Sequence, residues 1–221
     1  MKGVKYGIHG SDSKTRGFFL LMEKTIFLVR HGETDGNKDR RFIGSTDLPL
    51  NSEGREQVSS LKPLTSKLGF SRCICSPFLR CRETAGILLQ DSSPNFYSDE
   101  RIKDADFGKW EGLTFTEISA SYPEDVRRLM AFDDDFAFPQ GETLHGFLAR
   151  IRSFALDIND YRDDRILLVT HGGIIRFLLC HWLQLEPRHH VIFDVALAAL
   201  TTVKLYSGKG ILAALNERMA P

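Results

Sequence analysis

Two segments of this sequence share one pattern, in which an apolar run ends in a histidine followed by a glycine. The first is residues 26–34 (IFLVRHGET), and the second is residues 166–173 (ILLVTHGG). A short apolar run before glycine is typical of a buried parallel strand, and ligands in open α/β sheets bind where such strands end. The pattern therefore predicts two strands that deliver His31 and His171 to one edge of a sheet.

Helical and strand patterns alternate over the rest of the chain. Helices are predicted over residues 52–68, 78–90, 144–158 and 174–185, strands over 26–29, 72–75, 96–97 and 166–169, and a terminal hairpin over 199–215. Asn51 is suited to cap the first of these helices, and Pro63 should kink or split it. We expect an α/β fold, a three-layer sandwich whose mostly parallel central sheet is flanked by helices.

Composition limits the class of protein. The chain has 221 residues, of which 42% are hydrophobic and 26% charged, and its formal net charge is zero. A chain of this length can bury one large core, and its charge balance gives no bulk attraction for nucleic acid. Its cysteines show no paired metal-ligand spacing, which favours a reducing, cytoplasmic compartment: Cys73, Cys75, Cys81 and Cys180.

The first residues are expected to lie outside the folded domain. Residues 1–24 are rich in glycine and lysine, and we expect a poorly ordered extension before a single domain over residues 25–221. Its one apolar run, residues 18–22, is too short for a membrane span or a signal sequence. Met22 directly precedes the first strand, so residues 1–21 either lie before the true translation start or form a native tail.

Four side chains near predicted strand ends suit phosphoryl chemistry. Arg30 and Arg80 have the planar shape that captures a phosphoryl group with two hydrogen bonds each. Positive charge beside His31 should keep its ring neutral and nucleophilic, provided that its second nitrogen donates to a fixed acceptor such as a turn carbonyl. His171, if protonated, would stabilise charge on the transferring oxygens.

No metal and no other cofactor is expected at this site. The arginines would repel a zinc ion bound between His31 and His171. The other histidines fit no such pattern and are predicted to be solvated or to serve packing: His9, His145, His181, His189 and His190.

Four motifs occur together in one order: RHGET with Asn37, SPFLR (76–80) with TA (84–85), FGKWEGL (107–113) and HGG (171–173). Over residues 25–216 the chain resembles the histidine phosphatase superfamily, the phosphoglycerate-mutase-like proteins. The resemblance implies that His31 is phosphorylated during the reaction. It also implies a phosphate pocket made by Arg30, Asn37, Arg80, His171 and Gly172, and a metal-independent phosphatase acting on a small phosphorylated molecule.

The resemblance places the proton donor three residues before the Phe107–Gly108 step, at Asp104. The neighbouring Asp106 is the second candidate, and a surface carboxylate is the alternative for either one. A donor must be protonated when the leaving alkoxide departs, so burial or a nearby phosphate must raise its pKa.

The substrate is predicted from two further stretches, residues 136–147 and 169–181, which resemble α-ribazole phosphatases of cobalamin biosynthesis. Phe136 and Phe138 lie in a loop over residues 133–142 that should overhang the site and stack on a flat heteroaromatic group, unless they anchor the loop to the core. Arg41 and Gly44 belong to a second candidate substrate loop. The expected reaction is hydrolysis of α-ribazole 5′-phosphate.

Other functions are compatible with the same residues. A phosphoglycerate mutase or a broad-specificity sugar-phosphate phosphatase would use the same phosphohistidine. A non-catalytic phosphate-binding module would keep the arginines, although an intact His31 and a carboxylate at Asp104 argue against it. The sequence does not define the oligomeric state.

Overall fold

The computed structural model describes residues 23–90 and 95–218. Of the predicted extension, residues 1–24, residues 1–22 lie outside these ranges. The strands are β1 (Glu23–Arg30), β2 (Arg72–Cys75), β3 (Asn95–Ser98), β4 (Arg165–Thr170), β5 (Leu200–Tyr206) and β6 (Lys209–Glu217). The α-helices are α1 (Asp35–Lys38), α2 (Ser52–Thr65), α3 (Leu79–Leu89), α4 (Phe115–Ser121), α5 (Pro123–Met130), α6 (Leu144–Asp157) and α7 (Gly172–Trp182). Short 3-10 helices are η1 (Glu100–Ile102), η2 (Gly108–Trp110), η3 (Ile158–Asp160) and η4 (Pro187–Ile192).

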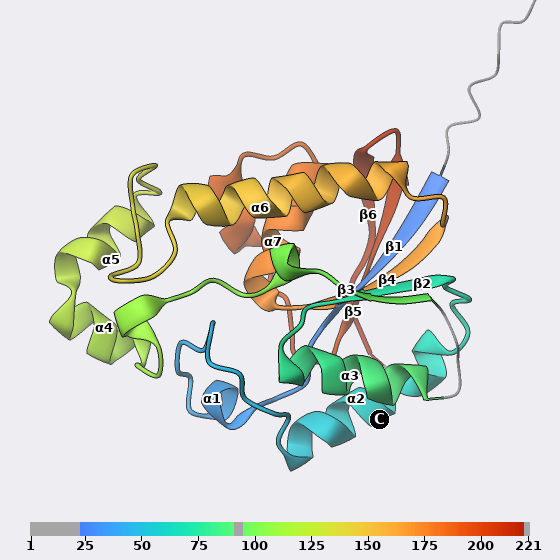
Figure 1. Ribbon diagram of the computed structural model, residues 1–221, viewed down its shortest axis with the longest axis horizontal. Coiled ribbons are helices and arrows are strands. Elements are labelled where there is room, and N and C mark those ends of the chain that lie inside the picture. Colours follow the sequence, from blue (N-terminus) through green and yellow to red (C-terminus); the bar gives the residue numbers. More distant parts are fainter. Residues whose placement is uncertain (1–22, 91–94, 219–221) are drawn as a thin grey trace, which may run out of the picture.

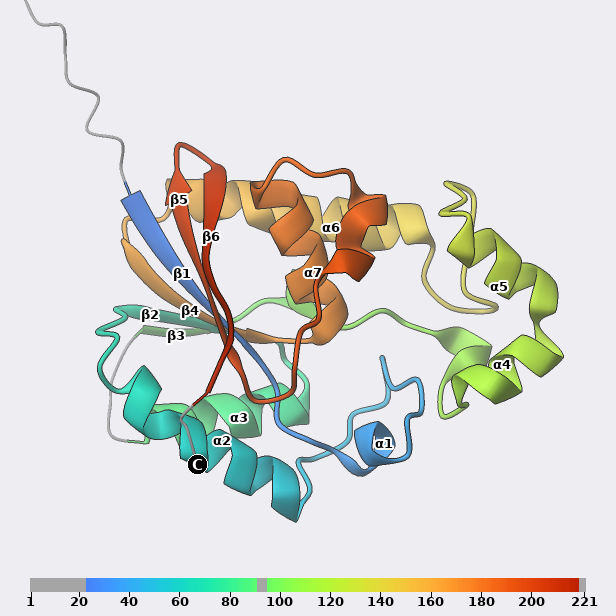
Figure 2. The ribbon, with the colours of Figure 1, turned by 180° about the vertical axis from the view of Figure 1, so that it is seen from behind.

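The strands form one mixed sheet in the order β3-β2-β4-β1-β5-β6. The four strands from β3 to β1 pair in parallel, whereas β5 is antiparallel to β1 and forms the predicted terminal hairpin with β6. Figure 2 shows this hairpin in front of the sheet's parallel part. The expected α/β fold with a mostly parallel sheet flanked by helices is confirmed.

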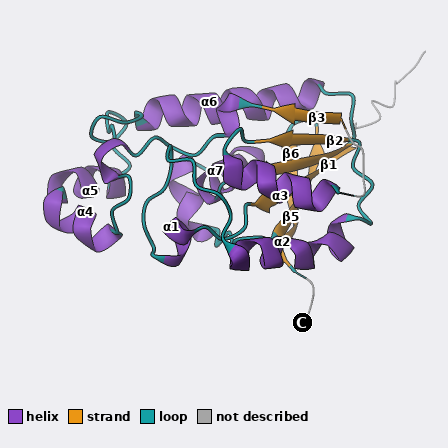
Figure 3. Cartoon of the chain, turned by 60° about the horizontal axis from the view of Figure 1, so that its bottom comes forward, coloured by secondary structure: helices purple, strands orange, loops and turns teal. Residues whose placement is uncertain are grey.

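Alternation along the strands explains the three layers. Ile26 and Leu28 of β1 belong to a core cluster that includes the apolar stripes of α6 and α7, while Phe27 and Val29 face a second cluster with α2 and α3. Successive strand residues point to opposite faces, so a continuous apolar run can bury both. The two helical layers lie on either side of the sheet, and α4 and α5 extend beyond its end (Figures 1 and 3).

The start of the folded domain and the effect of Pro63 differ from the sequence prediction. β1 begins at Glu23, so Glu23 and Lys24 belong to the sheet, where Lys24 pairs with Leu205 and its ammonium group donates to the Tyr161 and Asp163 carbonyls. Pro63 lies inside α2, two residues before the helix ends, and the helix continues through it instead of splitting there.

Hydrogen-bonding side chains cap several helices, including the predicted cap at Asn51. Asn51 caps α2 by accepting a hydrogen bond from the Gly54 N–H at 2.8 Å. Thr143 caps α6 in the same way, and Thr114 forms a capping box at α4. The four cysteines are buried as free thiols. In the described part of the chain, each helix is too short or too polar to cross a bilayer.

Candidate active site

The two histidines meet because their strands are neighbours. Arg30 of β1 pairs with Thr170 of β4, and the His31 N–H donates to the Thr170 carbonyl at 3.0 Å. The next residue on each chain segment is a histidine, and the ring centroids of His31 and His171 lie 5.2 Å apart. The convergence expected from the two apolar runs is therefore present.

His31 is buried and held in one tautomer. Its Nδ1 lies 2.8 Å from the carbonyl oxygen of Gly32, which can only accept, so Nδ1 carries the proton. The Nε2 lone pair is consequently free. Burial, followed by the charges of Arg80 and Arg30, lowers the pKa of His31 well below its usual range, although the Gly32 contact opposes this. A neutral imidazole with a free Nε2 is a competent nucleophile.

His171 is neutral in the unliganded site. The Arg80 Nε donates to its Nδ1 at 3.3 Å, so the ring proton belongs on Nε2, which lies 2.8 Å from the Ser76 Oγ. Burial lowers the pKa of His171 well below its ordinary value, with Arg80, His31 and Arg30 adding to the effect. The protonated form considered from the sequence is thus disfavoured until an anion enters.

Arg80 is the most enclosed cation of the site, with a side chain 1% exposed. Its two terminal nitrogens donate to the carbonyls of Gly44 (2.8 Å) and Thr46 (2.9 Å), which fixes the guanidinium plane. The helix that carries it is also tied to the reactive turn, because Thr84 Oγ1 donates to the Arg80 carbonyl and accepts from the Gly32 N–H.

The loop that holds Arg80 is itself held by Glu111. The Glu111 carboxylate accepts hydrogen bonds from the N–H groups of Gly44, Ser45 and Phe107 and from the Thr46 hydroxyl. Gly44 is required here because a Cβ would lie 1.8 Å from the Ala105 carbonyl oxygen. Gly44 therefore positions Arg80 through its backbone and allows residues 44–46 to pack against the segment that bears Asp104.

Arg30 completes the cationic part of the site. One terminal nitrogen donates to the Val195 carbonyl at 2.7 Å, while its buried Nε has no hydrogen-bond partner within the described residues. A Cβ on Gly172 would lie 3.2 Å from the Arg30 guanidinium carbon, so the start of α7 passes closely over this side chain. An anion is the partner that a buried, unpaired guanidinium N–H lacks.

Asn37 is placed differently from the arginines. Its side-chain oxygen accepts from the N–H and hydroxyl of Thr34, which forms the capping box of α1. Its amide NH₂ remains available for an anion. The phosphate contact expected at Asn37 stays a prediction.

The structure separates the two candidate proton donors. Asp104 lies at the site, with Oδ2 3.6 Å from His171 Nδ1 and 4.0 Å from the Arg80 guanidinium. Burial raises the pKa of Asp104 even though Arg80 and the Ala105 N–H oppose it. Asp106 is exposed and accepts hydrogen bonds from Gly108 N–H and the Ser45 hydroxyl. Asp104 is therefore the better-placed donor.

A pocket of about 470 Å³ opens beside Asp104. Its lining includes Ser45, Phe78, Lys103, Asp104, Asp106 and Arg150. The Phe78 ring lies between the site and the pocket, 5.7 Å from the His171 ring and 4.7 Å from the Arg80 guanidinium carbon. The pocket's position next to the donor suits it to the leaving group.

The prediction that Phe136 and Phe138 overhang the site is wrong, and the alternative, that they anchor their loop to the core, is correct. Phe136 is fully buried and Phe138 is 5% exposed, and both pack against Trp110 in the core. Burying two phenyl rings is worth about 1.5–3 kcal/mol each, which outweighs exposing them to a pocket. The segment closes on itself, since Leu144 N–H donates to the Phe136 carbonyl.

Arg41 also lies apart from the pocket lining. Its guanidinium donates to the Gly112 carbonyl at 2.7 Å and lies 3.6 Å from the Glu117 carboxylate. No role was predicted for Ser76, Thr84 or Glu111, although each stands inside one of the four sequence motifs. Their positions in the motifs next to Arg80 and Asp104 were the sequence signal that could have identified them.

Comparisons with known proteins agree with this geometry. The model of the histidine phosphatase superfamily (branch 1) matches residues 26–218. The adenosylcobalamin/α-ribazole phosphatase of Salmonella typhimurium is 27% identical over 197 residues, covering 87% of this chain and 96% of that protein. An Escherichia coli O1:K1 / APEC protein named "Probable phosphoglycerate mutase GpmB" is 30% identical over 148 residues, 66% of this chain and 69% of its own.

A solved structure agrees over nearly the whole fold. The α-ribazole phosphatase of Shigella flexneri superposes with a TM-score of 0.81 at 25% identity, covering 89% of this chain and 98% of that one. The fold and these relatives define the class of protein, an α/β phosphatase. The chain belongs to the histidine phosphatase superfamily. Within residues 23–90 and 95–218, no group of three or more His, Cys, Asp or Glu side chains is placed to hold a metal ion.

Proposed function

We propose that this enzyme hydrolyses a phosphomonoester through a phosphohistidine on His31, and that its substrate is α-ribazole 5′-phosphate. The observation that carries the chemistry is the hydrogen bond from His31 Nδ1 to the Gly32 carbonyl, which leaves Nε2 unprotonated beside the buried Arg80 and the partly buried Arg30. In this proposal Arg30 and Arg80 bind the phosphoryl oxygens, with Asn37, His171 and Gly172 around them.

The reaction then has two balanced steps. His31 Nε2 attacks phosphorus, the bond to the leaving oxygen breaks, and Asp104 gives its proton to that oxygen. The Asp104 carboxylate next takes a proton from water, whose oxygen attacks the phosphohistidine. The N–P bond breaks, inorganic phosphate leaves and Asp104 is protonated again. His171 can gain a proton when a dianion offsets the charges of Arg80 and Arg30.

The charges around the pocket support a leaving group without a second anion. Arg150 is paired with the Glu142 carboxylate at 2.7 Å and Lys103 with Glu100 at 2.8 Å. The third cation in the lining, Arg101, is paired with Asp99 at 2.8 Å. A phosphoglycerate carboxylate would have to displace one of these partners, whereas α-ribazole would not. Phe78 provides an aromatic face in the pocket lining, in place of Phe136 and Phe138.

A substrate panel tests this proposal. We expect kcat/KM to be higher for α-ribazole 5′-phosphate than for fructose bisphosphates, simple sugar phosphates or 3-phosphoglycerate. Glycerol 3-phosphate is the matched control for 3-phosphoglycerate, because it replaces the carboxylate by a hydroxymethyl group. Higher efficiency with another member of the panel would overturn the substrate and leave the phosphohistidine chemistry in place.

Phosphoglycerate mutase is the second candidate, favoured by the similarity to the GpmB protein. Interconversion of 3- and 2-phosphoglycerate faster than their hydrolysis would establish it. We place the reaction in the cytoplasm and in a single catalytic domain, and the four free thiols support a reducing compartment.

A further inference from the structure

The Arg150 side chain of α6 donates hydrogen bonds to the backbone of the segment that carries Asp104. One terminal nitrogen donates to the carbonyls of Arg101 and Lys103, both at 2.7 Å. The other donates to the Asp104 carbonyl at 3.0 Å. A single guanidinium thus holds three carbonyls of one short segment, from a helix more than forty residues further along the chain.

Glu142 locks Arg150 in this orientation. The two side chains form a double hydrogen bond, Nε to Oε1 at 2.7 Å and Nη2 to Oε2 at 2.9 Å. The Glu142 N–H donates to the Asp106 carbonyl at 2.9 Å, so the same pair is attached on both sides of Asp104. Their side chains are 18% and 21% exposed, which limits competition from water.

This arrangement answers a geometric need of the proton donor. An aspartate side chain is one methylene shorter than a glutamate, so its reach depends more strongly on where the backbone lies. Among the described residues, the Asp104 carboxyl group accepts one hydrogen bond, from the Ala105 N–H at 3.2 Å, and its Oδ2 lies 3.6 Å from His171 Nδ1. The carboxyl group therefore receives its position mainly through the backbone.

We infer that Arg150 is a positioning residue for the proton donor Asp104, acting through the carbonyls of Arg101, Lys103 and Asp104. The inference rests on the proposed role of Asp104. Arg150 does not touch the reacting atoms, although it is part of the pocket lining. It is paired with Glu142, and its charge contributes only the last of the named causes that lower the pKa of Asp104. Its removal should leave the phosphate cradle intact and loosen the donor alone.

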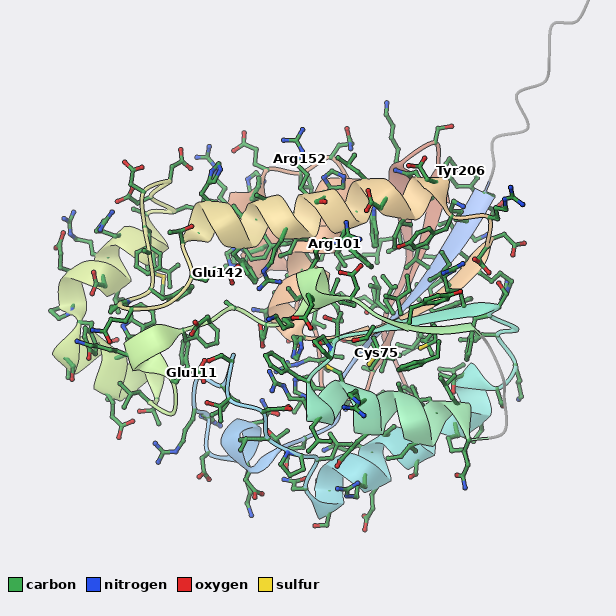
Figure 4. All side chains as sticks on the ribbon, viewed as in Figure 1. Cys75, Arg101, Glu111, Glu142, Arg152 and Tyr206 are labelled. Atoms are coloured by element: carbon green, nitrogen blue, oxygen red, sulfur yellow. The ribbon has the colours of Figure 1, made fainter. Side chains whose placement is uncertain are left out.

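The test compares Arg150→Met and Arg150→Lys with Arg152→Met as the matched control. Arg152 is exposed on the outer side of the same helix (Figure 4). We expect Arg150→Met to lower kcat/KM for an alkyl phosphate by about 30- to 100-fold, as for a misplacement of about 1 Å, and for p-nitrophenyl phosphate by less than about threefold. Arg150→Lys should recover part of the loss, and inhibition by inorganic phosphate should be unchanged.

Equal losses with both substrates would overturn the inference, since a general structural defect would have that effect. A double mutant distinguishes a failure of the inference about Arg150 from a failure of the proposed function. In an Asp104→Asn background, Arg150→Met should cost less than about threefold for the alkyl phosphate, because the donor is already absent. If Asp104→Asn lowers kcat/KM equally for the alkyl and the p-nitrophenyl phosphate, the donor assignment fails. If Asp104→Asn lowers kcat/KM more for the alkyl phosphate and the effects of the two substitutions are additive, the donor assignment stands and the positioning role of Arg150 is excluded. Should Arg150→Met not fold, Glu142→Gln weakens the same clamp and must give the same pattern.

Discussion

The phosphate cradle and the leaving-group pocket are adjacent but built in different ways. The cradle is defined by Arg30, His31, Arg80 and His171, of which Arg30 is partly buried and the other three are buried. Each side chain comes from or directly follows a strand or helix end. The pocket is lined by Ser45, by Phe78, by side chains of η1 and of residues 103–106, and by the paired Glu142 and Arg150. Its cations are all paired with carboxylates. The cradle is specialised for one charged group, whereas the pocket tolerates an uncharged one.

The contrast predicts that cradle and donor substitutions respond differently to the leaving group. Asp104→Asn should lower kcat/KM for alkyl phosphates by about a thousandfold and for p-nitrophenyl phosphate by less than tenfold, because nitrophenolate leaves without a proton. Steady-state kinetics with both substrates checks this. Equal losses would move the donor role to Asp106 or make Asp104 structural.

The raised pKa of Asp104 gives the same variant a stability signature. A carboxyl group whose folded-state pKa is raised favours folding fully below its unfolded pKa, and this contribution is lost as pH rises through the folded value. Asp104→Asn should therefore melt at a higher temperature than wild type at pH 7, with the difference shrinking toward pH 3. A thermal melt at both pH values checks the sign, and a lower Tm at pH 7 would contradict it.

Arg80→Met tests the cradle, and its effect should not depend on the leaving group. Loss of a preorganised contact to the phosphoryl oxygens should reduce kcat/KM by about a hundredfold or more with alkyl and p-nitrophenyl phosphates alike. Arg82→Met, an exposed arginine on the same helix, is the control. Unchanged efficiency would remove Arg80 from the site.

Glu111→Gln should have a smaller effect of the same kind. A glutamine offers one acceptor oxygen where the carboxylate accepts from three donors of residues 44–46 and from the Phe107 N–H, so residues 44–46 should loosen and Arg80 with them. We expect about a tenfold loss of kcat/KM for both substrate types. Figure 4 shows Glu111 on the side of the molecule near α1. A variant with full activity would show that the loop holds Arg80 without it.

Phe78→Leu should have the smallest effect and should sharpen the comparison from the pocket side. Loss of the aromatic face should raise KM for an aromatic leaving group by about threefold while leaving simple alkyl phosphates unchanged. Michaelis constants for both classes measure this. Equal changes would indicate that Phe78 acts on Arg80 or His171 instead.

The difference between the two regions also explains what the sequence could predict. The cradle residues follow apolar runs and helix caps, so local pattern placed Arg30, His31 and His171 correctly, and the fold followed from the same alternation. Gly44 was predicted to belong to a substrate loop. The structure shows that its backbone packs closely against the Ala105 carbonyl, a contact that only the tertiary structure reveals.

The pocket could not be predicted in this way. Phe136 and Phe138 carry no local sign of the Trp110 surface that buries them. Arg150 lies in the helix predicted over residues 144–158 and belongs to no sequence motif. Its carbonyl partners lie 46 to 49 residues away along the chain. Contacts of that range depend on the packing of α6 against η1, which no short pattern encodes.

The most direct test of the account is to trap the phosphoenzyme. Wild-type protein mixed with a labelled phosphomonoester and quenched within milliseconds should carry phosphate that is stable in alkali and labile in acid, and peptide mapping should place it on His31. His31→Ala should show neither the label nor turnover. Label at another residue, or turnover that persists in His31→Ala, would contradict a phosphohistidine mechanism at this site.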